Sequence, residues 1–199
     1  MEGLAHGDYL LRVSLHEEQL DAIRRLRLAV ALTAVHDPEI TMSDHTLSSP
    51  VLRSATADDL AGIVSLLASS DLPTVGVSEA LSGFVVVDDG GDIVGVVGVE
   101  ACGDHYALLR STAVDPSWRG RGLGRQLVER AVGDAEARCI EALYLLTTTA
   151  ESYFSSFGFS VVSRAIVPDE VKATQEFRSA CPASATVMTL SLTSGRKKP

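Results

Sequence analysis

The sequence predicts an α/β fold, with a mixed, mostly antiparallel sheet, a central parallel βαβ crossover and flanking helices. Two observations carry this prediction. Three apolar segments between residues 84 and 115 follow one another with only short turns between them, which is typical of an antiparallel meander. A Gly- and Arg-rich turn after residue 115 then leads into an amphipathic helix and a fully apolar run, the order expected of a strand, a crossover helix and a parallel strand.

Composition limits the class of protein. The chain has 199 residues, of which 46% are hydrophobic, enough for one cored domain and a modest extension. No apolar run reaches the roughly 18 to 20 residues of a membrane span, and residues 1–8 lack the basic residues of a secretion signal. We therefore expect a cytoplasmic protein without a membrane partner. The net charge of −9 argues against a nucleic-acid partner.

Three parts are predicted along the chain: an N-terminal helical extension and linker over residues 1–49, a domain over 50–193, and a flexible tail over 194–199. Residues 15–35 have helix-favouring composition, and the residue before Pro38 disfavours helix. The extension is either a regulatory or dimerisation arm or a dispensable segment.

The first half of the domain reads as a strand, a helix and the meander. A short strand is expected at 51–55, and Thr56 and Asp59 form a capping box that opens a helix. The remaining predicted elements of this half are a loop at 69–76, a short helix at 77–82, and strands at 84–87, 93–102 and 105–115.

The second half begins with a long helix. Its apolar face consists of Leu123, Leu127, Ala131 and Ala135. The run 142–146 has no polar residue and is expected to be a strand buried on both faces. After it the sequence predicts a second capping box at 148–151 that opens a helix ending at Gly158, a strand at 159–166, a helix at 168–180 and a last strand at 186–192.

The segment most informative about function is the loop before the long helix, Arg119-Gly120-Arg121-Gly122-Leu123-Gly124. Glycines at a strand-to-helix junction allow backbone N–H groups to converge, and the helix dipole adds positive potential, so the loop is suited to phosphate. It lacks the Lys-Ser or Lys-Thr of a Walker A loop, and its GxGxG spacing differs from the GxGxxG of a dinucleotide loop. A purely structural turn remains the other alternative.

No metal site is expected. The three cysteines show no CxxC spacing, and the five histidines show no HExxH spacing.

Residues 51–192 resemble the GNAT (Gcn5-related) N-acetyltransferases. The family pattern R/Q-x-x-G-x-G/A is matched by Arg119, Gly122 and Gly124, and Ala113-Val114-Asp115-Pro116 matches the segment before it. The resemblance implies an acetyl-CoA-dependent acyltransferase without a metal, and a homodimer. It implies that the amides of Arg119, Gly120, Arg121, Gly122, Leu123 and Gly124 bind the pyrophosphate, and that the backbone of Ala113 and Val114 pairs with the pantetheine arm.

Within that family the chain is similar to the arsenic-resistance N-acetyltransferases. The stretches that carry this similarity are 71–77, 108–111, 144–151 and 176–182. It implies a small-molecule amine substrate that resembles an amino acid, such as an arsenic- or phosphorus-containing glutamate analogue acetylated on its α-amine. A peptide or protein N-acetyltransferase and a non-catalytic CoA-binding regulatory domain are the alternatives.

The family implies direct transfer to a neutral amine, which needs a base and an acid. Glu100, near the end of a strand, is the candidate base, and a solvated strand end is the alternative. Phe154 occupies the position of the family's acidic Tyr. Tyr153 comes one residue earlier, about 100° away around a helix. Tyr153, a water or the Ser111 hydroxyl are therefore the candidate acids.

Arg110, expected in phase with Thr112 and Val114, is the candidate anchor for a substrate carboxylate, and a structural ion pair is the alternative. Arg178, with Glu176 nearby, falls in a segment that often closes the family's acceptor site, or on a plain surface helix. Thr147 either contacts substrate or caps a helix.

Overall fold

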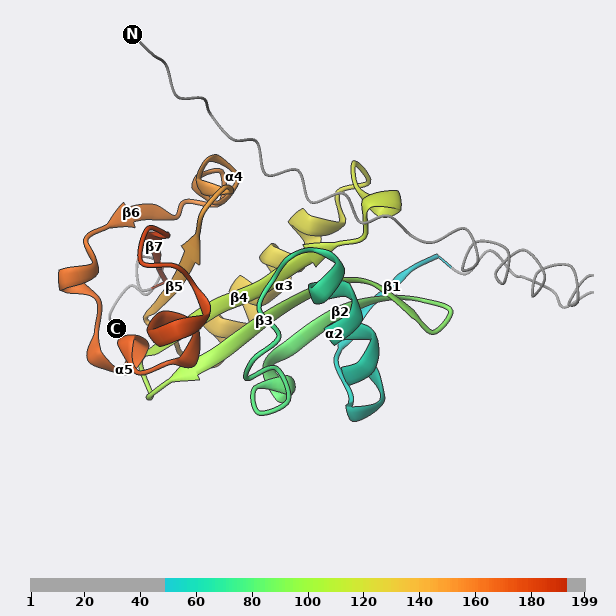
Figure 1. Ribbon diagram of the computed structural model, residues 1–199, viewed down its shortest axis with the longest axis horizontal. Helices are drawn as coiled ribbons and strands as arrows, with labels where there is room; N and C mark the ends of the chain where they lie inside the picture. Colours follow the sequence, from blue (N-terminus) through green and yellow to red (C-terminus); the bar gives the residue numbers. More distant parts are fainter. Residues whose placement is uncertain (1–48, 193–199) are drawn as a thin grey trace, which may run out of the picture. The chain divides into compact units, whose positions relative to one another are not determined.

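Seven strands form one sheet in the order β1-β2-β3-β4-β5-β7-β6 (Figure 1). The computed structural model describes residues 49–192, so the predicted helix at 15–35 and the tail at 194–199 lie outside the described residues. The strands are β1 (Val51–Ser54), β2 (Phe84–Asp89), β3 (Asp92–Cys102), β4 (Tyr106–Val114), β5 (Ala142–Thr147), β6 (Ser160–Val162) and β7 (Thr186–Ser191). All neighbours pair antiparallel except β4 and β5, which are parallel. The predicted mixed sheet is confirmed.

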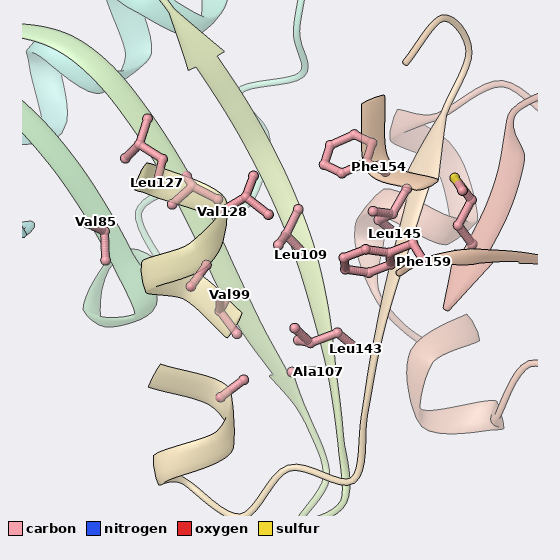
Figure 2. Packing of buried hydrophobic residues seen from close by; sticks show 14 of the residues in the cluster. Val85, Val99, Ala107, Leu109, Leu127, Val128, Leu143, Leu145, Phe154 and Phe159 are labelled. Carbon is pink, nitrogen blue, oxygen red and sulfur yellow. The ribbon is translucent and has the colours of Figure 1, made fainter. Parts of the chain in front are cut away.

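Two longer helices cover opposite faces of the sheet. The helices of the described region are α2 (Leu60–Ser69), α3 (Leu123–Ala137), α4 (Glu151–Ser155) and α5 (Asp169–Lys172). Figure 2 shows Leu127 and Val128 of α3 packed over the strand residues Val99 and Leu109. The α2 face holds a separate cluster that includes Ile63 and Val86. The apolar face predicted for α3 is confirmed, because all four of its residues are buried.

A β-bulge in β4 changes which residues share a face. Val96 pairs with Ala113 but Gly98 pairs with Arg110, so β4 has one extra residue there. Ser111 lies at this point with φ 56°. Arg110 therefore lies on the α2 face with Ala113, and its expected phase with Val114, which packs against the α3 cluster, is wrong. Side-chain alternation alone does not reveal such an insertion.

A second irregularity affects β3. The pairing of β2 with β3 shifts after Val87, and Val94 packs in the α3 cluster while Val96 packs in the α2 cluster. Strict alternation along β3 would place Glu100 on one face with Val94 and Val96, but Glu100 does not share a face with Val94.

Four local predictions differ from the structure in part or in whole. Residues 77–82 form turns and a 3₁₀ turn (Leu81–Gly83) in place of the predicted short helix, because the Gly83 N–H donates to the Ala80 carbonyl three residues back. Strand β6 ends early where the Ser163 hydroxyl accepts from the Ala165 N–H and starts a 3₁₀ turn. The segment 168–180 divides into α5 and a π-helical turn (Glu176–Ala180), because the Thr174 hydroxyl caps the junction. The capping box predicted at 148–151 does not form, because the N-cap of α4 is Ala150, which has no side-chain cap, and the Thr147 Oγ1 accepts from the Ala150 N–H at 2.9 Å.

Strand β5 is less buried than its sequence predicts. Leu143 and Leu145 are buried, whereas Tyr144 and Leu146 on the other face are only partly buried. The apolar run therefore does not have two fully covered faces.

An ion-pair network joins β1 to the start of α2. Both Nη atoms of Arg53 donate to the Asp59 carboxylate at 2.7 Å, and Nη2 also donates to Asp88 at 2.8 Å. Asp59 accepts from the Thr56 N–H at 2.7 Å, which confirms the predicted reciprocal cap. The Arg53 guanidinium holds the pKa of Asp59 well below its usual range. In residues 49–192 no helix combines the length and apolarity needed to cross a membrane.

Candidate active site between the parted strands

Strands β4 and β5 separate part-way along their length. They pair only where Tyr106–Leu108 face Ala142–Tyr144. Figure 2 shows the strands close together at Ala107 and Leu143 and apart at Leu109 and Leu145. The separation opens into a cavity of about 560 Å³ whose walls include residues 109–114 and 145–150. The β4 backbone beyond Leu108 therefore borders this cavity, hereafter the fork cavity, where an added strand would pair.

The loop predicted to bind phosphate lies at one end of the fork cavity, with Arg119 and Gly124 in its wall. The loop begins with a 3₁₀ turn (Pro116–Trp118). Gly120 and Gly122 adopt φ of 76° and 80°, the left-handed region that favours glycine. Gly122 is the N-cap of α3, so the first N–H groups of that helix have no intrahelical acceptor.

The same loop carries exposed positive charge and open space. The Arg119 Nε donates to the Val114 carbonyl at 3.0 Å, which ties the loop to the end of β4. The Arg121 guanidinium carbon lies 4.4 Å from the centroid of the Trp118 ring. A Cβ built on Gly120 or Gly122 meets no atom of the described residues within 4 Å. Free N–H donors, two arginines and an open approach suit a pyrophosphate.

The two adjacent aromatic residues of α4 lie in different surroundings. Phe154 is buried in the α3-side core, where its ring centroid lies 5.9 Å from that of Phe159 (Figure 2). Tyr153 is 40% exposed, lies in the wall of the fork cavity and has its hydroxyl beside Gly124, within 2.8 Å of where a Cβ would be. Burial raises the pKa of Tyr153, so its hydroxyl keeps its proton at neutral pH.

Arg110, the predicted carboxylate anchor, lies between two carboxylates. Its side chain is 1% exposed. Nη1 donates to Glu100 Oε2 at 2.6 Å, and Nη2 donates to the Val75 carbonyl at 2.6 Å. Nη2 also lies 2.7 Å from Glu176 Oε2, an ion-pair separation whose angle does not make a hydrogen bond. The guanidinium is therefore already engaged on both sides.

The two carboxylates face different spaces. Glu176 and Arg110 lie in the wall of the fork cavity. Glu100, the predicted base, instead lines a second hollow of about 340 Å³ together with Glu79 and Arg138. Arg110 borders both spaces and separates them.

Glu176 received no catalytic role from its sequence. It is 7% exposed at the start of the π-helical turn, and the Cys181 Sγ donates to its Oε1 at 3.5 Å. Burial raises the pKa of the Glu176 carboxyl, and the nearby Arg110 opposes this shift. In the sequence, only one feature of Glu176 pointed to a role in the site: it lies in the segment that often closes the acceptor site of the family.

Most of the remaining predicted residues lie in the wall of the fork cavity, and one does not. Ser111 and Thr147 lie in it, with Ala113 and Val114. Within residues 49–192 the buried Ser111 hydroxyl has no hydrogen-bond partner. Arg178 is exposed and does not belong to the wall. The described residues hold no group of three His, Cys, Asp or Glu side chains arranged for a metal.

Comparison with known proteins gives a family match over part of the chain and a similar fold. Residues 80–161 match the sequence profile of the acetyltransferase (GNAT) domain. The fold is similar to that of Mycobacterium tuberculosis Rv2747 in complex with CoA and NLQ, with a TM-score of 0.61 and 23% identity over 71% of this chain and 99% of that one. The chain has the α/β fold of the GNAT acetyltransferases. The fold is also similar to that of N-acetylglutamate synthase from Neisseria gonorrhoeae complexed with coenzyme A and N-acetyl-glutamate, with a TM-score of 0.62 and 18% identity over 73% of this chain and 35% of that one.

Two curated relatives of the chain are named amino-acid acetyltransferases. The chain is 30% identical over 137 residues to an amino-acid acetyltransferase of Ralstonia nicotianae, covering 63% of this chain and 29% of the relative. It is 28% identical over 118 residues to that of Pseudomonas putida, covering 55% and 27%. The chain thus spans less than a third of the length of these relatives. Neither is named for arsenic resistance, the narrower resemblance seen in the sequence.

Proposed function

We propose that the GNAT domain transfers the acetyl group of acetyl-CoA to the amine of a small acceptor that resembles an amino acid. The observation that carries this proposal is the single fork cavity. It reaches from the arginine- and glycine-rich loop, along the free edge of β4, to the Arg110–Glu176 ion pair. Its volume of about 560 Å³ lies within the roughly 300 to 1,000 Å³ usual for small-molecule sites. The names of the curated relatives point to the same acceptor class.

Acetyl-CoA, the co-substrate typical of the family, supplies an activated thioester. The first N–H groups of α3, with Arg119 and Arg121, hold its pyrophosphate. The β4 backbone at Ala113 and Val114 holds the pantetheine arm as an added strand. The Val114 N–H is the candidate donor to the developing oxyanion. Tyr153, protonated and beside Gly124, is the candidate acid, and the buried Ser111 hydroxyl, which has no hydrogen-bond partner among the described residues, is the second.

The acceptor end suits a zwitterion. The cation of Arg110 matches an acceptor carboxylate, and the carboxylate of Glu176 beside it matches an acceptor ammonium. Thr147 adds a hydroxyl to the same wall. Glutamate analogues that contain arsenic or phosphorus, suggested by the narrower resemblance, carry the same α-amino-acid group. The homodimer remains a prediction.

The test follows release of the CoA thiol with a panel of acceptors: glutamate and other amino acids, arsinothricin, phosphinothricin, polyamines, aminoglycosides and short peptides. We expect saturable turnover on members of the amino-acid group and none on peptides. The matched control is Arg138→Ala, an exposed arginine away from the fork cavity, against Arg119→Ala, which should weaken acetyl-CoA binding. Turnover on peptides alone would support a peptide acetyltransferase. Binding of acetyl-CoA without turnover of any amine would refute catalysis.

A further inference from the structure

Three charged side chains meet where the fork cavity is closed off from the second hollow. We infer that Glu176, rather than Glu100, receives the ammonium group of the acceptor and accepts its proton before acetyl transfer. This inference rests on the proposed function and adds the identity of the proton acceptor.

Position distinguishes the two carboxylates. Both contact the guanidinium of Arg110, Glu100 through Nη1 at 2.6 Å and Glu176 through Nη2 at 2.7 Å. Only Glu176 belongs to the wall of the fork cavity, which is where an acceptor can reach the parted strands. Glu100 lies on the far side of an arginine whose side chain is 1% exposed. An acceptor bound in the fork cavity therefore meets Glu176 first.

The two carboxylates, Glu100 and Glu176, also differ in their hydrogen bonds. Glu100 Oε2 accepts a hydrogen bond from Arg110, and 24% of the Glu100 side chain is exposed, so solvent also stabilises its charge. Glu176 Oε2 is buried and has no hydrogen-bond partner within residues 49–192, although it lies against the guanidinium. A buried carboxylate oxygen without a donor is costly. An acceptor N–H would satisfy it.

The charge of the cluster favours a cation. One guanidinium faces two carboxylates, which leaves one negative charge in excess next to the fork cavity. The third neighbour of Glu176 is the Cys181 thiol, whose pKa burial raises to about 11, so it adds no charge near neutral pH. The other titratable groups of the cavity wall are Asp71, Arg119 and Tyr153. An ammonium is attracted to this excess charge, and burial strengthens that attraction.

The proton transfer balances within the cluster. An N–H bond of the ammonium breaks and an O–H bond forms on the Glu176 carboxyl, while the electron pair stays on nitrogen as the nucleophile. The bound ammonium neutralises the excess negative charge of the cluster, and transfer then replaces the ammonium–carboxylate pair by a neutral amine and a neutral carboxyl beside the Arg110–Glu100 ion pair. Glu176 releases its proton to solvent through the open cavity after the product departs.

The decisive experiment measures kcat/KM against pH for the full chain with the best amino acid of the panel. In the wild type, activity should fall as pH decreases through the pKa of Glu176, which burial raises, because the ionised form is the active base. Glu176→Gln should lower kcat/KM near neutral pH by about 100-fold. Its optimum should move to alkaline pH, because the variant must capture the rare neutral amine. Acetyl-CoA affinity should be unchanged.

Two companion variants make the result specific. Glu100→Gln also removes a carboxylate from Arg110, so a purely structural role would make its profile match that of Glu176→Gln. We expect Glu100→Gln to keep both the fall of kcat/KM at low pH and the optimum of kcat/KM near neutral pH. Glu141→Gln, an exposed carboxylate that pairs with His105, is the control for charge alone.

Each outcome decides the inference. An unshifted optimum in Glu176→Gln, or a shift in Glu100→Gln alone, overturns it while the proposed function stands. No turnover by the wild type on any amine overturns the proposed function and the inference with it. If Glu176→Gln does not fold, Glu176→Asp replaces it: a carboxylate one methylene shorter should lower kcat without changing acetyl-CoA affinity, and a wild-type kcat overturns the inference.

Discussion

Replacing Gly122 by alanine should separate the stability of the loop from its function. Gly122 has φ 80° immediately before α3, and a Cβ there meets no atom of residues 49–192 within 4 Å, so crowding within this part of the chain contributes nothing. The left-handed conformation costs an L-residue about 1–2 kcal/mol. The less flexible unfolded chain returns about 0.4–1 kcal/mol. Gly122→Ala should therefore lower the free energy of unfolding by about 1 kcal/mol.

Acetyl-CoA binding should suffer more than stability. The added methyl group would occupy the open space in front of the loop, where a pyrophosphate must approach the N–H donors of α3. Lost contacts worth about 1.4 kcal/mol weaken affinity tenfold. We expect Kd and KM for acetyl-CoA to rise at least about tenfold, with kcat nearly unchanged, because uniform binding is removed.

Gly133→Ala is the matched control in the same helix. A Cβ on Gly133 also meets no atom within 4 Å, and its φ is outside the left-handed region. An interior helical alanine should stabilise by about 0.5–1 kcal/mol and leave Kd unchanged. Urea unfolding and calorimetric titration with acetyl-CoA measure both quantities. Wild-type affinity in Gly122→Ala would refute the role of the loop amides in binding pyrophosphate.

Three further substitutions test other parts of the structure. Arg110→Met should lower the free energy of unfolding by about 3–5 kcal/mol, because it leaves buried Glu176 without its cation. The double variant with Glu176→Gln should recover part of the lost free energy of unfolding in urea denaturation. No recovery would contradict the Arg110–Glu176 ion pair. Asp59→Asn should lower the free energy of unfolding by about 1–3 kcal/mol at pH 7. Because Arg53 depresses the folded-state pKa of Asp59, its contribution is full above the unfolded pKa of about 3.9 and fades as pH falls toward the lower folded value. The variant's deficit in urea unfolding should therefore shrink as pH falls below about 4, and a deficit that stays constant from pH 7 to pH 2 would count against the network. Tyr153→Phe should lower kcat about 100-fold in the thiol-release assay with melting temperature little changed, and a wild-type kcat would exclude Tyr153 as the acid.

The sequence was sufficient wherever structure is set locally. The apolar spacing of α3 is repeated within the helix itself, so the four predicted core positions are all buried. The order of hairpins, glycine-rich turn, helix and apolar strand was enough to predict the mixed sheet and the parallel β4–β5 pair. The same local information placed the loop at 119–124 between strand and helix.

The candidate site was less accessible because it depends on register and on burial by distant segments. The extra residue at Ser111 changes the face of Arg110, and only pairing with β3 reveals it. Glu176 was indistinguishable from a surface residue, because its burial comes from packing near Arg110, 66 positions earlier in the chain. Glu100 is the opposite case: it was predicted to be the base in the cleft, but it lies behind Arg110 and lines the second hollow.

The paired state of Arg110 also bears on which amines the site selects. An acceptor with only an ammonium group can satisfy Glu176 Oε2, but it leaves the guanidinium with the partners it already has. An acceptor with only a carboxylate must compete with Glu176 for Arg110 and would leave a second buried negative charge. A zwitterionic amino acid does both at once, because its carboxylate takes over the cation while its ammonium takes over the carboxylate. The exchange replaces one ion pair by two, so an amino acid gains a contact with Arg110 that a polyamine lacks, and amino acids should be preferred over polyamines as acceptors.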